Sequence, residues 1–196
     1  PIESIMDSTL KALKTTFKDA AEDVTEENLQ ARIRGNILMA LSNKFGWLVL
    51  VTGNKSEMAT GYSTLYGDMA GGLAVLKDLY KTQVYMIAER LNELGEKDVI
   101  PSNVFFKAPS AELKEGQKDQ DTLPPYEILD EIHRFHIEEG LSAEEIVLEG
   151  FERSTVEHSL KLLRKSEYKR KQCAPGIKVS KRAFGKDWRM PITNHY

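Results

Sequence analysis

The sequence predicts a helix-rich α/β protein organised around a parallel sheet, and two features carry that prediction. The first is a short apolar run from Leu48 to Val51, which ends on Thr52-Gly53-Asn54. A continuous apolar run of this length is typical of a strand buried on both faces of a parallel sheet. The second is a series of segments with apolar residues at helical spacing on both sides of that run. A weaker strand candidate lies near Val104–Lys107, and because buried backbone groups must be paired, the strand needs neighbours that the pattern does not mark clearly.

The amphipathic segments predict the order of the helices. Thr25 is the predicted N-cap of the second helix, with Glu26 and Glu27 near its positive end. Ser142-x-x-Glu145 is a capping box that predicts another helix start. The polar stretch 107–125 has no apolar periodicity, so we expect a mobile loop there. The expected elements are a helix at 2–18, a helix at 25–44, the strand at 48–52, a short helix carrying Glu57, a helix at 81–94, a short helix after Pro101, helices at 125–139, 143–150 and 154–171, and a basic tail over 173–196.

Composition limits the classes of protein that this chain can belong to. Its 196 residues carry a formal net charge of -3 with 29% charged residues, and this length can bury a substantial core. There is no apolar run long enough to span a membrane and no secretory signal pattern, so we expect no membrane partner. Cys173 is the only cysteine, which excludes an internal disulfide and a multi-cysteine metal site. We therefore expect a cytoplasmic protein.

The carboxyl end of the predicted strand has the features of a nucleotide site. Thr52 exposes a hydroxyl where the strand ends, and Glu57 follows on the first turn of a short helix. Ligands of open α/β sheets bind just outside such strand ends. A glycine-rich loop with Gly61, Gly67, Gly71 and Gly72 comes next, around two tyrosines and an aspartate. A plain surface loop is the alternative, but strand, hydroxyl, acid and flexible loop together favour a nucleotide site.

Five ordered blocks resemble a known family over essentially the whole chain. They lie at residues 28–34, 52–57, 65–72, 109–113 and 167–172. In this order they closely resemble the synthetase domain of NAD synthetase, and residues 65–72 together with the basic tail resemble its glutamine-dependent branch. The ammonia-dependent branch usually has Lys where Leu65 stands and Asp where Gly72 stands, so this chain departs from it. The resemblance implies an adenine-nucleotide α-hydrolase-like (Rossmann-like) parallel sheet, here truncated and helix-rich.

The resemblance also implies a reaction. ATP adenylates the nicotinate carboxylate of deamido-NAD, pyrophosphate leaves, and ammonia derived from glutamine attacks the acyl-adenylate to give NAD and AMP. Such chemistry needs Mg²⁺ on the phosphates, donors for the transition state and a site that excludes water. The implied ligands are therefore ATP, Mg²⁺, deamido-NAD and ammonia, and the implied partners are a glutaminase domain and further copies of the chain in a homodimer or higher homo-oligomer.

Site residues are carried over from the family by position. Glu57 resembles the acid that serves Mg²⁺ or substrate, and it is the predicted catalytic residue and tentative Mg²⁺ ligand. Without the resemblance, such residues are more often merely solvated: a lone carboxylate, a lysine at a helix start or an arginine on a helix. Their assignment to the site therefore rests on the resemblance. The predicted ATP contacts are Thr52, Lys81 and Ser110, and the predicted deamido-NAD contacts are Asn28, Arg32, Glu57, Tyr62, Ser63, Thr64, Leu65 and Lys169.

Two family features do not occur in these residues. The phosphate loop Ser-Gly-Gly-x-Asp-Ser is absent, and so is the Cys-Glu-Lys set of the glutaminase domain. We therefore expect the chain to be the C-terminal portion of the synthetase domain, with the first strand and the phosphate loop upstream of Pro1, and to be inactive on its own. The alternative is an inert structural or dimerisation portion of the enzyme that contributes only packing and substrate contacts.

The remaining candidates are weaker. The basic residues between Arg164 and Arg189 would suit a nucleic-acid face, but the aromatic residues among them match no RNA-module pattern and the chain is acidic overall. We therefore expect no nucleic-acid partner. Cys173 lies in a basic tail and is a poor nucleophile candidate. The four histidines, His133, His136, His158 and His195, show no metal-ligand spacing.

Overall fold

The sheet is small and parallel, and it consists of two strands in the part of the chain that the structure describes. The computed structural model describes residues 1–95 and 99–193. Strand β1 (Leu50–Val51) pairs in parallel with β2 (Leu73–Ala74), with Leu50 opposite Leu73 and Val51 opposite Ala74. Ala74 also bridges Gly176 in the C-terminal segment. The predicted strand at 48–52 is thus confirmed in a shorter form, and β2 is the neighbour that the sequence did not mark.

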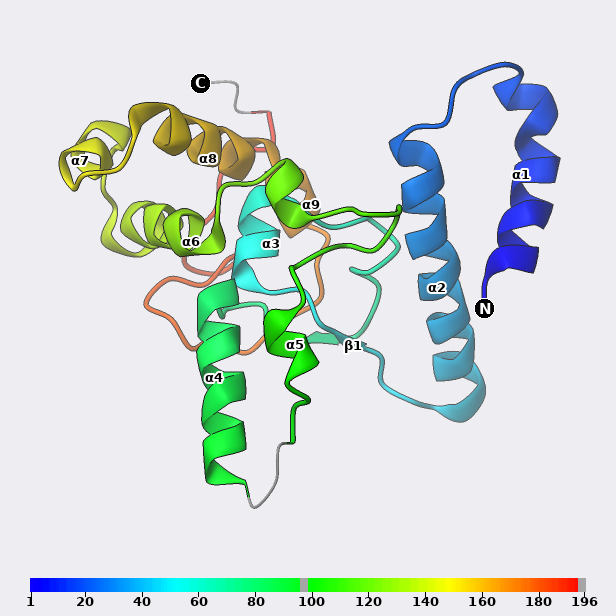
Figure 1. Cartoon of the computed structure of the whole chain (residues 1–196), viewed down its shortest axis with the longest axis horizontal. Helices are drawn as coiled ribbons and strands as arrows, with labels where there is room; N and C mark the ends of the chain where they lie inside the picture. The colour runs from blue at the N-terminus through cyan, green and yellow to red at the C-terminus, as the bar shows by residue number, and fades with distance from the viewer. Residues whose placement is uncertain (96–98, 194–196) are drawn as a thin grey trace.

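Two long helices form a hairpin beside the sheet. Helix α1 (Glu3–Phe17) runs antiparallel to α2 (Val24–Phe45), and in Figure 1 this pair stands apart from the remaining helices. Asp23, not Thr25, caps α2: its side chain accepts from the Thr25 backbone N–H at 2.7 Å, and Glu26 accepts the Asp23 N–H in return. Gly46 ends α2 in the left-handed conformation that glycine adopts without strain.

The elements that follow the strands carry the predicted site. Helix α3 (Lys55–Thr60) follows β1 and carries Glu57 on its first turn, as the sequence predicts, and it starts behind an Asn54–Glu57 capping box that was not predicted. Helix α4 (Lys81–Leu94) has its predicted bounds. The weak strand candidate near Val104–Lys107 is wrong, since α5 (Asn103–Phe106) is a short helix. The polar stretch after it contains a 3₁₀ turn, η1 (Asp119–Asp121), that buries Asp119.

The C-terminal half packs into a helical core. It consists of α6 (Tyr126–Arg134), a π-helical turn η2 (Phe135–Glu139), α7 (Ala143–Leu148), α8 (Arg153–Lys165) and α9 (Glu167–Arg170). Ser142 and Glu145 form the predicted capping box of α7. The side chains of Leu129, Ile132, Ile137, Ile146 and Leu163 are fully buried and centre the core on α6–α8, with α3 packed against them.

A buried lysine fastens the C-terminal segment to this core. The Lys55 ammonium has no solvent exposure and lies 2.8 Å from Glu138 and 3.1 Å from Asp78. Asp78 in turn accepts the backbone N–H groups of Val179 and Ser180. The start of α3 is thereby tied to η2 and to the segment after Pro175. In the part of the chain that the structure describes, no helix is both long and apolar enough to cross a membrane.

Candidate functional site

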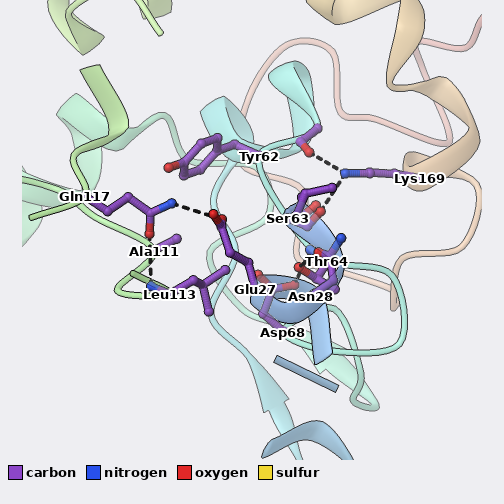
Figure 2. Close-up of a pocket in the computed structure, with 12 residues that line it drawn as sticks. Glu27, Asn28, Tyr62, Ser63, Thr64, Asp68, Ala111, Leu113, Gln117 and Lys169 are labelled. Carbon is purple, nitrogen blue, oxygen red and sulfur yellow. Dashed lines mark hydrogen bonds between the residues drawn. The ribbon is translucent and has the colours of Figure 1, made fainter. Parts of the chain in front are cut away.

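A cavity of about 200 Å³ collects five of the residues predicted to contact substrate. It opens between the first turn of α2, the loop after α3, the polar stretch at 111–117 and α9, as Figure 2 shows. Its walls combine two carboxylates, two amides, hydroxyls, an aromatic ring and one ammonium. They are formed by Val24, Glu27, Asn28, Gly61, Tyr62, Ser63, Thr64, Asp68, Ala111, Leu113, Gln117 and Lys169.

The floor of the cavity is held by hydrogen bonds between α2 and the loop. The Thr64 hydroxyl donates to Asn28 Oδ1 at 2.8 Å, and the Thr64 backbone N–H donates to Asp68 Oδ1 at 2.7 Å. Asn28 reaches the site because it lies on the first turns of α2, whose start Asp23 fixes. On the opposite wall, the Gln117 amide donates to Glu27 at 3.4 Å and accepts the Leu113 N–H at 2.9 Å. Together with α9, the cavity is therefore a polar site built from four segments that are distant in the sequence.

Lys169 enters the cavity from α9. Its ammonium donates to the carbonyl oxygens of Gly61 at 2.7 Å and Ser63 at 2.6 Å (Figure 2). Partial burial lowers the pKa of Lys169, whereas the negative charge of Asp68 raises it. Both carbonyl partners are neutral, so the positive charge of Lys169 stays available to an anionic or electron-rich ligand in the cavity.

Glu57 and Lys81 form an ion pair beside the cavity. Lys81 Nζ lies 3.4 Å from Glu57 Oε1 and 5.6 Å from the centre of the Tyr126 ring, and both side chains of the pair are 21% exposed. Asn54 fixes the carboxylate by donating its backbone N–H at 3.1 Å and its side-chain amide at 2.7 Å. Desolvation raises the pKa of Glu57 and the Lys81 charge opposes that shift. The pair is anchored, but its charged ends still reach solvent.

A buried carboxylate lies between the ion pair and the cavity. Asp119 is 3% exposed and accepts the Tyr126 hydroxyl at 2.6 Å, while its second oxygen has no hydrogen-bond partner among the described residues. Its charge raises the pKa of Glu57, and burial together with that charge raises the pKa of Tyr62 to about 12. Tyr62 therefore stays protonated and can act as a donor. The charge of Asp119 therefore acts on both Glu57 and Tyr62.

Besides Glu57 and Lys81, four further predicted residues lie outside this cavity. Arg32 donates from Nε to the Leu65 carbonyl at 3.2 Å on the exposed side of α2, and Leu65 packs against the core. Thr52 lines a separate hollow between α2 and β1. Ser110 lines a third, shallow hollow along 107–118 and accepts the Glu112 N–H at 3.0 Å. Ser110 and Thr52, two of the three residues predicted to contact ATP, thus line different hollows.

Several residues of the site carry no signal in the sequence. Asp119 follows a polar run, and only the fold brings it under Tyr126. Glu27 was predicted only as a helix-start charge, and Asp68 only as part of a glycine-rich loop, yet both line the cavity. Their roles depend on contacts between segments far apart in the chain, which helical or strand periodicity does not encode.

A divalent cation would find one carboxylate ligand at the ion pair. Among residues 1–95 and 99–193, no group of three or more His, Cys, Asp or Glu side chains is arranged to hold a metal. His195 lies outside the described residues. Mg²⁺ is commonly held by one or two carboxylates plus substrate phosphates, so Glu57 fits a single-ligand role of that kind.

Comparisons with known proteins agree with this architecture. Residues 2–173 match the family model described as NAD synthase. The chain is 64% identical, over its whole length, to the glutamine-dependent NAD(+) synthetase of Thermotoga maritima, and it covers 34% of that protein. A solved structure titled as the Acinetobacter baumannii glutamine-dependent NAD+ synthetase in complex with ADP is similar over 98% of this chain and 34% of its own, with 47% identity and a TM-score of 0.53.

A more distant structure supports the fold. The glutamine-dependent NAD(+) synthetase of Cytophaga hutchinsonii matches with a TM-score of 0.73 at 22% identity, over 98% of this chain and 33% of that one. The chain spans about a third of the length of the curated relatives it matches. The predicted fold class is confirmed: a helix-rich chain with a small parallel sheet, shared with structures of this kind.

Proposed function

Because the chain belongs to the NAD synthase family, we propose that the protein carrying it is an ATP-dependent amide ligase that makes NAD. The substrates are deamido-NAD, ATP and ammonia, the carboxylate is activated as an acyl-adenylate, and AMP and pyrophosphate are released. The observation that carries the proposal is the joint placement of Asn28, Tyr62, Ser63, Thr64 and Lys169 around one polar cavity, beside the Glu57–Lys81 pair.

The cavity is proposed to hold the nicotinate end of deamido-NAD. Its volume of about 200 Å³ suits one ring and its carboxylate rather than a whole dinucleotide. The Tyr62 ring and hydroxyl line one side, and the Lys169 ammonium supplies positive charge on another. An anionic carboxylate gains a charge-assisted contact there, since the present acceptors of Lys169 are neutral carbonyls.

The ion pair is proposed to serve the phosphates of ATP. Lys81 is a compact point charge whose ammonium can contact a phosphate oxygen. Mg²⁺, when bound, supplies neutralisation of phosphate charge, with Glu57 as its one ligand from these residues. Asn54 keeps the Glu57 carboxylate in place through two donated hydrogen bonds. Thr52, Ser110, Arg32 and Leu65 remain proposed ligand contacts at the periphery.

Replacing Glu57 tests this assignment. In the full-length protein that carries the chain, Glu57→Gln keeps the side-chain shape but removes the charge, so the rate of NAD formation should fall at least ten-fold, equivalent to about 1.4 kcal/mol of barrier. Steady-state assays with deamido-NAD, MgATP and ammonia measure it. Glu144→Gln, at an exposed position of α7, is the matched control. An unchanged rate for Glu57→Gln would remove Glu57 from the site.

The parent protein is proposed to contain a glutaminase domain and to work in the cytoplasm. The relatives are named glutamine-dependent and are about three times as long as this chain, which supports a further domain that releases ammonia. The 196 residues are proposed to be the C-terminal portion of the synthetase domain. Ammonia generated close to the site would reach the activated carboxylate without entering bulk water.

The exposed hairpin supports a homo-oligomer. None of the apolar residues of α1 is buried, and Ile5 is 42% exposed. At the far end of α2, Phe45 and Trp47 stack with ring centres 4.8 Å apart and remain more than half exposed. We propose that a second copy covers this face. Light scattering at micromolar concentration should give a mass above that of one chain, and a strict monomer in a folded sample counts against the proposal.

A further inference from the structure

A buried aspartate outside the cavity holds the starts of two helices together. Asp130 of α6 is 3% exposed and does not line the cavity. Its carboxylate accepts the Ser56 hydroxyl, the Thr82 backbone N–H at 3.0 Å and the Thr82 hydroxyl at 2.9 Å. Ser56 belongs to α3 and Thr82 to α4, so one carboxylate joins three helices.

The first turn of α4 depends on this arrangement. The residue before the helix, Tyr80, provides no side-chain cap. Instead, the Lys81 backbone N–H donates to Ser56 Oγ at 2.8 Å, and the next N–H, that of Thr82, donates to Asp130. The first N–H groups of a helix have no partner within the helix and need one from elsewhere. Asp130 and Ser56 therefore cap α4 from two other helices.

The same contacts set the position of the Glu57–Lys81 pair. Ser56 directly precedes Glu57, and the Lys81 N–H is bonded to that serine. With both backbones fixed by the buried carboxylate, Lys81 Nζ reaches Glu57 Oε1 at 3.4 Å and lies over the Tyr126 ring. Tyr126 starts the helix that contains Asp130. The backbones of Glu57, Lys81 and Tyr126 are thus all held in place by α6.

We propose that Asp130 is a positioning residue for the phosphate-handling pair Glu57–Lys81: it does not touch substrate, but it fixes Lys81 and Glu57 at the separation that receives the phosphates of MgATP. This inference rests on the proposed function, since it assigns the pair to phosphate. A purely structural Asp130 would only join α6 to α3 and α4, and its loss would lower stability without a specific effect on Lys81.

A double-mutant cycle distinguishes the two roles. The variants are Asp130→Asn, Lys81→Met and their combination in the full-length protein, and calorimetry gives the affinity for MgATP. We expect Asp130→Asn to weaken MgATP binding at least five-fold when Lys81 is present and less than two-fold in the Lys81→Met background. Equal losses in both backgrounds would overturn the proposal.

Two controls separate positioning from general loosening of the fold. Ser159→Ala removes a fully buried hydroxyl in α8, away from α4, and should leave MgATP affinity unchanged at a comparable cost in thermal stability. Thr82→Val removes only one of the hydrogen bonds to Asp130 and serves if Asp130→Asn does not fold. Thr82→Val should weaken MgATP binding about two-fold, again only when Lys81 is present. An unchanged affinity for MgATP would contradict the proposal.

A second readout does not depend on the reaction. Amide hydrogen exchange at Lys81 and Thr82 should accelerate at least ten-fold in Asp130→Asn, relative to amides in the middle of α4. Unchanged exchange at both positions would overturn the positioning role. If the exchange result is as expected but wild-type protein binds no MgATP, the proposed function is wrong and the role of Asp130 in holding the start of α4 stands.

Discussion

The α6–α8 core and the α1–α2 hairpin both contain amphipathic helices but are buried to very different degrees. In the core, Leu129, Ile132, Ile146 and Leu163 have no exposed surface. In α1, which is longer than any of those three helices, no residue is buried. This difference in burial shows that an amphipathic pattern determines which face of a helix is apolar. Whether that face is buried depends on the other segments of the fold.

The two regions also differ in whether they bury polar and charged side chains. The described buried polar and charged residues all lie at position 54 or beyond, outside the hairpin. Three of them, Lys55, His133 and Arg170, are cationic or titratable side chains that water cannot stabilise. The stability of the core should therefore depend on specific charge partners and on pH, and that of the hairpin should not.

The largest effect should come from Arg170. Its guanidinium donates to the carbonyls of Met58 at 3.1 Å and Ala59 at 3.0 Å, pairs with Glu167 at 3.0 Å, and lies 5.3 Å from the centre of the Trp188 ring. Arg170→Ala removes a donor from both carbonyls and leaves the buried Glu167 carboxylate only the Lys171 ammonium, 3.7 Å away. The free energy of unfolding should therefore fall by about 3–5 kcal/mol. Urea titration followed by circular dichroism measures this loss.

The matched control is an arginine whose ion pair faces water. Arg153 lies 3.7 Å from Glu157, and both side chains are more than half exposed. Arg153→Ala should cost less than about 1 kcal/mol. If Arg170→Ala lowers the free energy of unfolding no more than Arg153→Ala does, the stability of the core does not depend on its buried charge. The core and the hairpin would then not differ in this respect.

The next effect is a pH dependence from His133. Its side chain is fully buried, and desolvation, assisted by the charges of His136 and Arg170, lowers its pKa from about 6.5 to about 4. Between these values the unfolded chain takes up a proton that the native chain excludes, so stability falls as pH falls through this range. When pH falls from above the unfolded-state pKa to below the native-state pKa, the free energy of unfolding should decrease by about 3 kcal/mol.

Unfolding curves at pH 7, 5.5 and 4.5 give this dependence. In His133→Gln the slope between pH 7 and 4.5 should become shallower, because the titrating group is removed. His158→Gln, at an exposed position of α8, should keep the wild-type slope. Parallel slopes for wild type and His133→Gln would show that His133 is protonated in the native state without penalty.

Much of the fold could be predicted from the sequence, because helix starts and apolar periodicity are local signals. The bounds of α4, the place of Glu57 on the first turn of α3 and the capping box of α7 are confirmed. The strand β2 was missed because Leu73–Ala74 directly follows Gly71 and Gly72 and was therefore taken as part of the glycine-rich loop. The strand expected near Val104–Lys107 was wrong because its apolar residues form a single helical turn instead.

The site could be predicted only where the family resemblance marked it. That resemblance selected Asn28, Tyr62, Ser63, Thr64 and Lys169, and the fold brings them around one cavity. The assignment of ligands to them stays a proposal. Asp119 and Asp130 could not be found in this way, since the importance of each comes from burial beside a tyrosine or a helix start that lies elsewhere in the chain.

The smallest effect is expected in the hairpin, and it compares the two regions most directly. Leu10 of α1 and Leu163 of α8 are the same residue type on two amphipathic helices, but Leu10 is only half-buried whereas Leu163 is fully buried. Leu163→Ala removes packed methyl groups and should cost about 2–5 kcal/mol, whereas Leu10→Ala should cost less than about 1 kcal/mol in a monomer. Urea unfolding at nanomolar to micromolar protein concentration measures both. If a second copy covers α1, the cost of Leu10→Ala should rise with concentration, because association stabilises the folded chain by mass action, while the cost of Leu163→Ala should stay constant. A cost for Leu10→Ala that equals that of Leu163→Ala at every concentration would mean that α1 is packed as firmly as the core, and the distinction between the two regions would not hold.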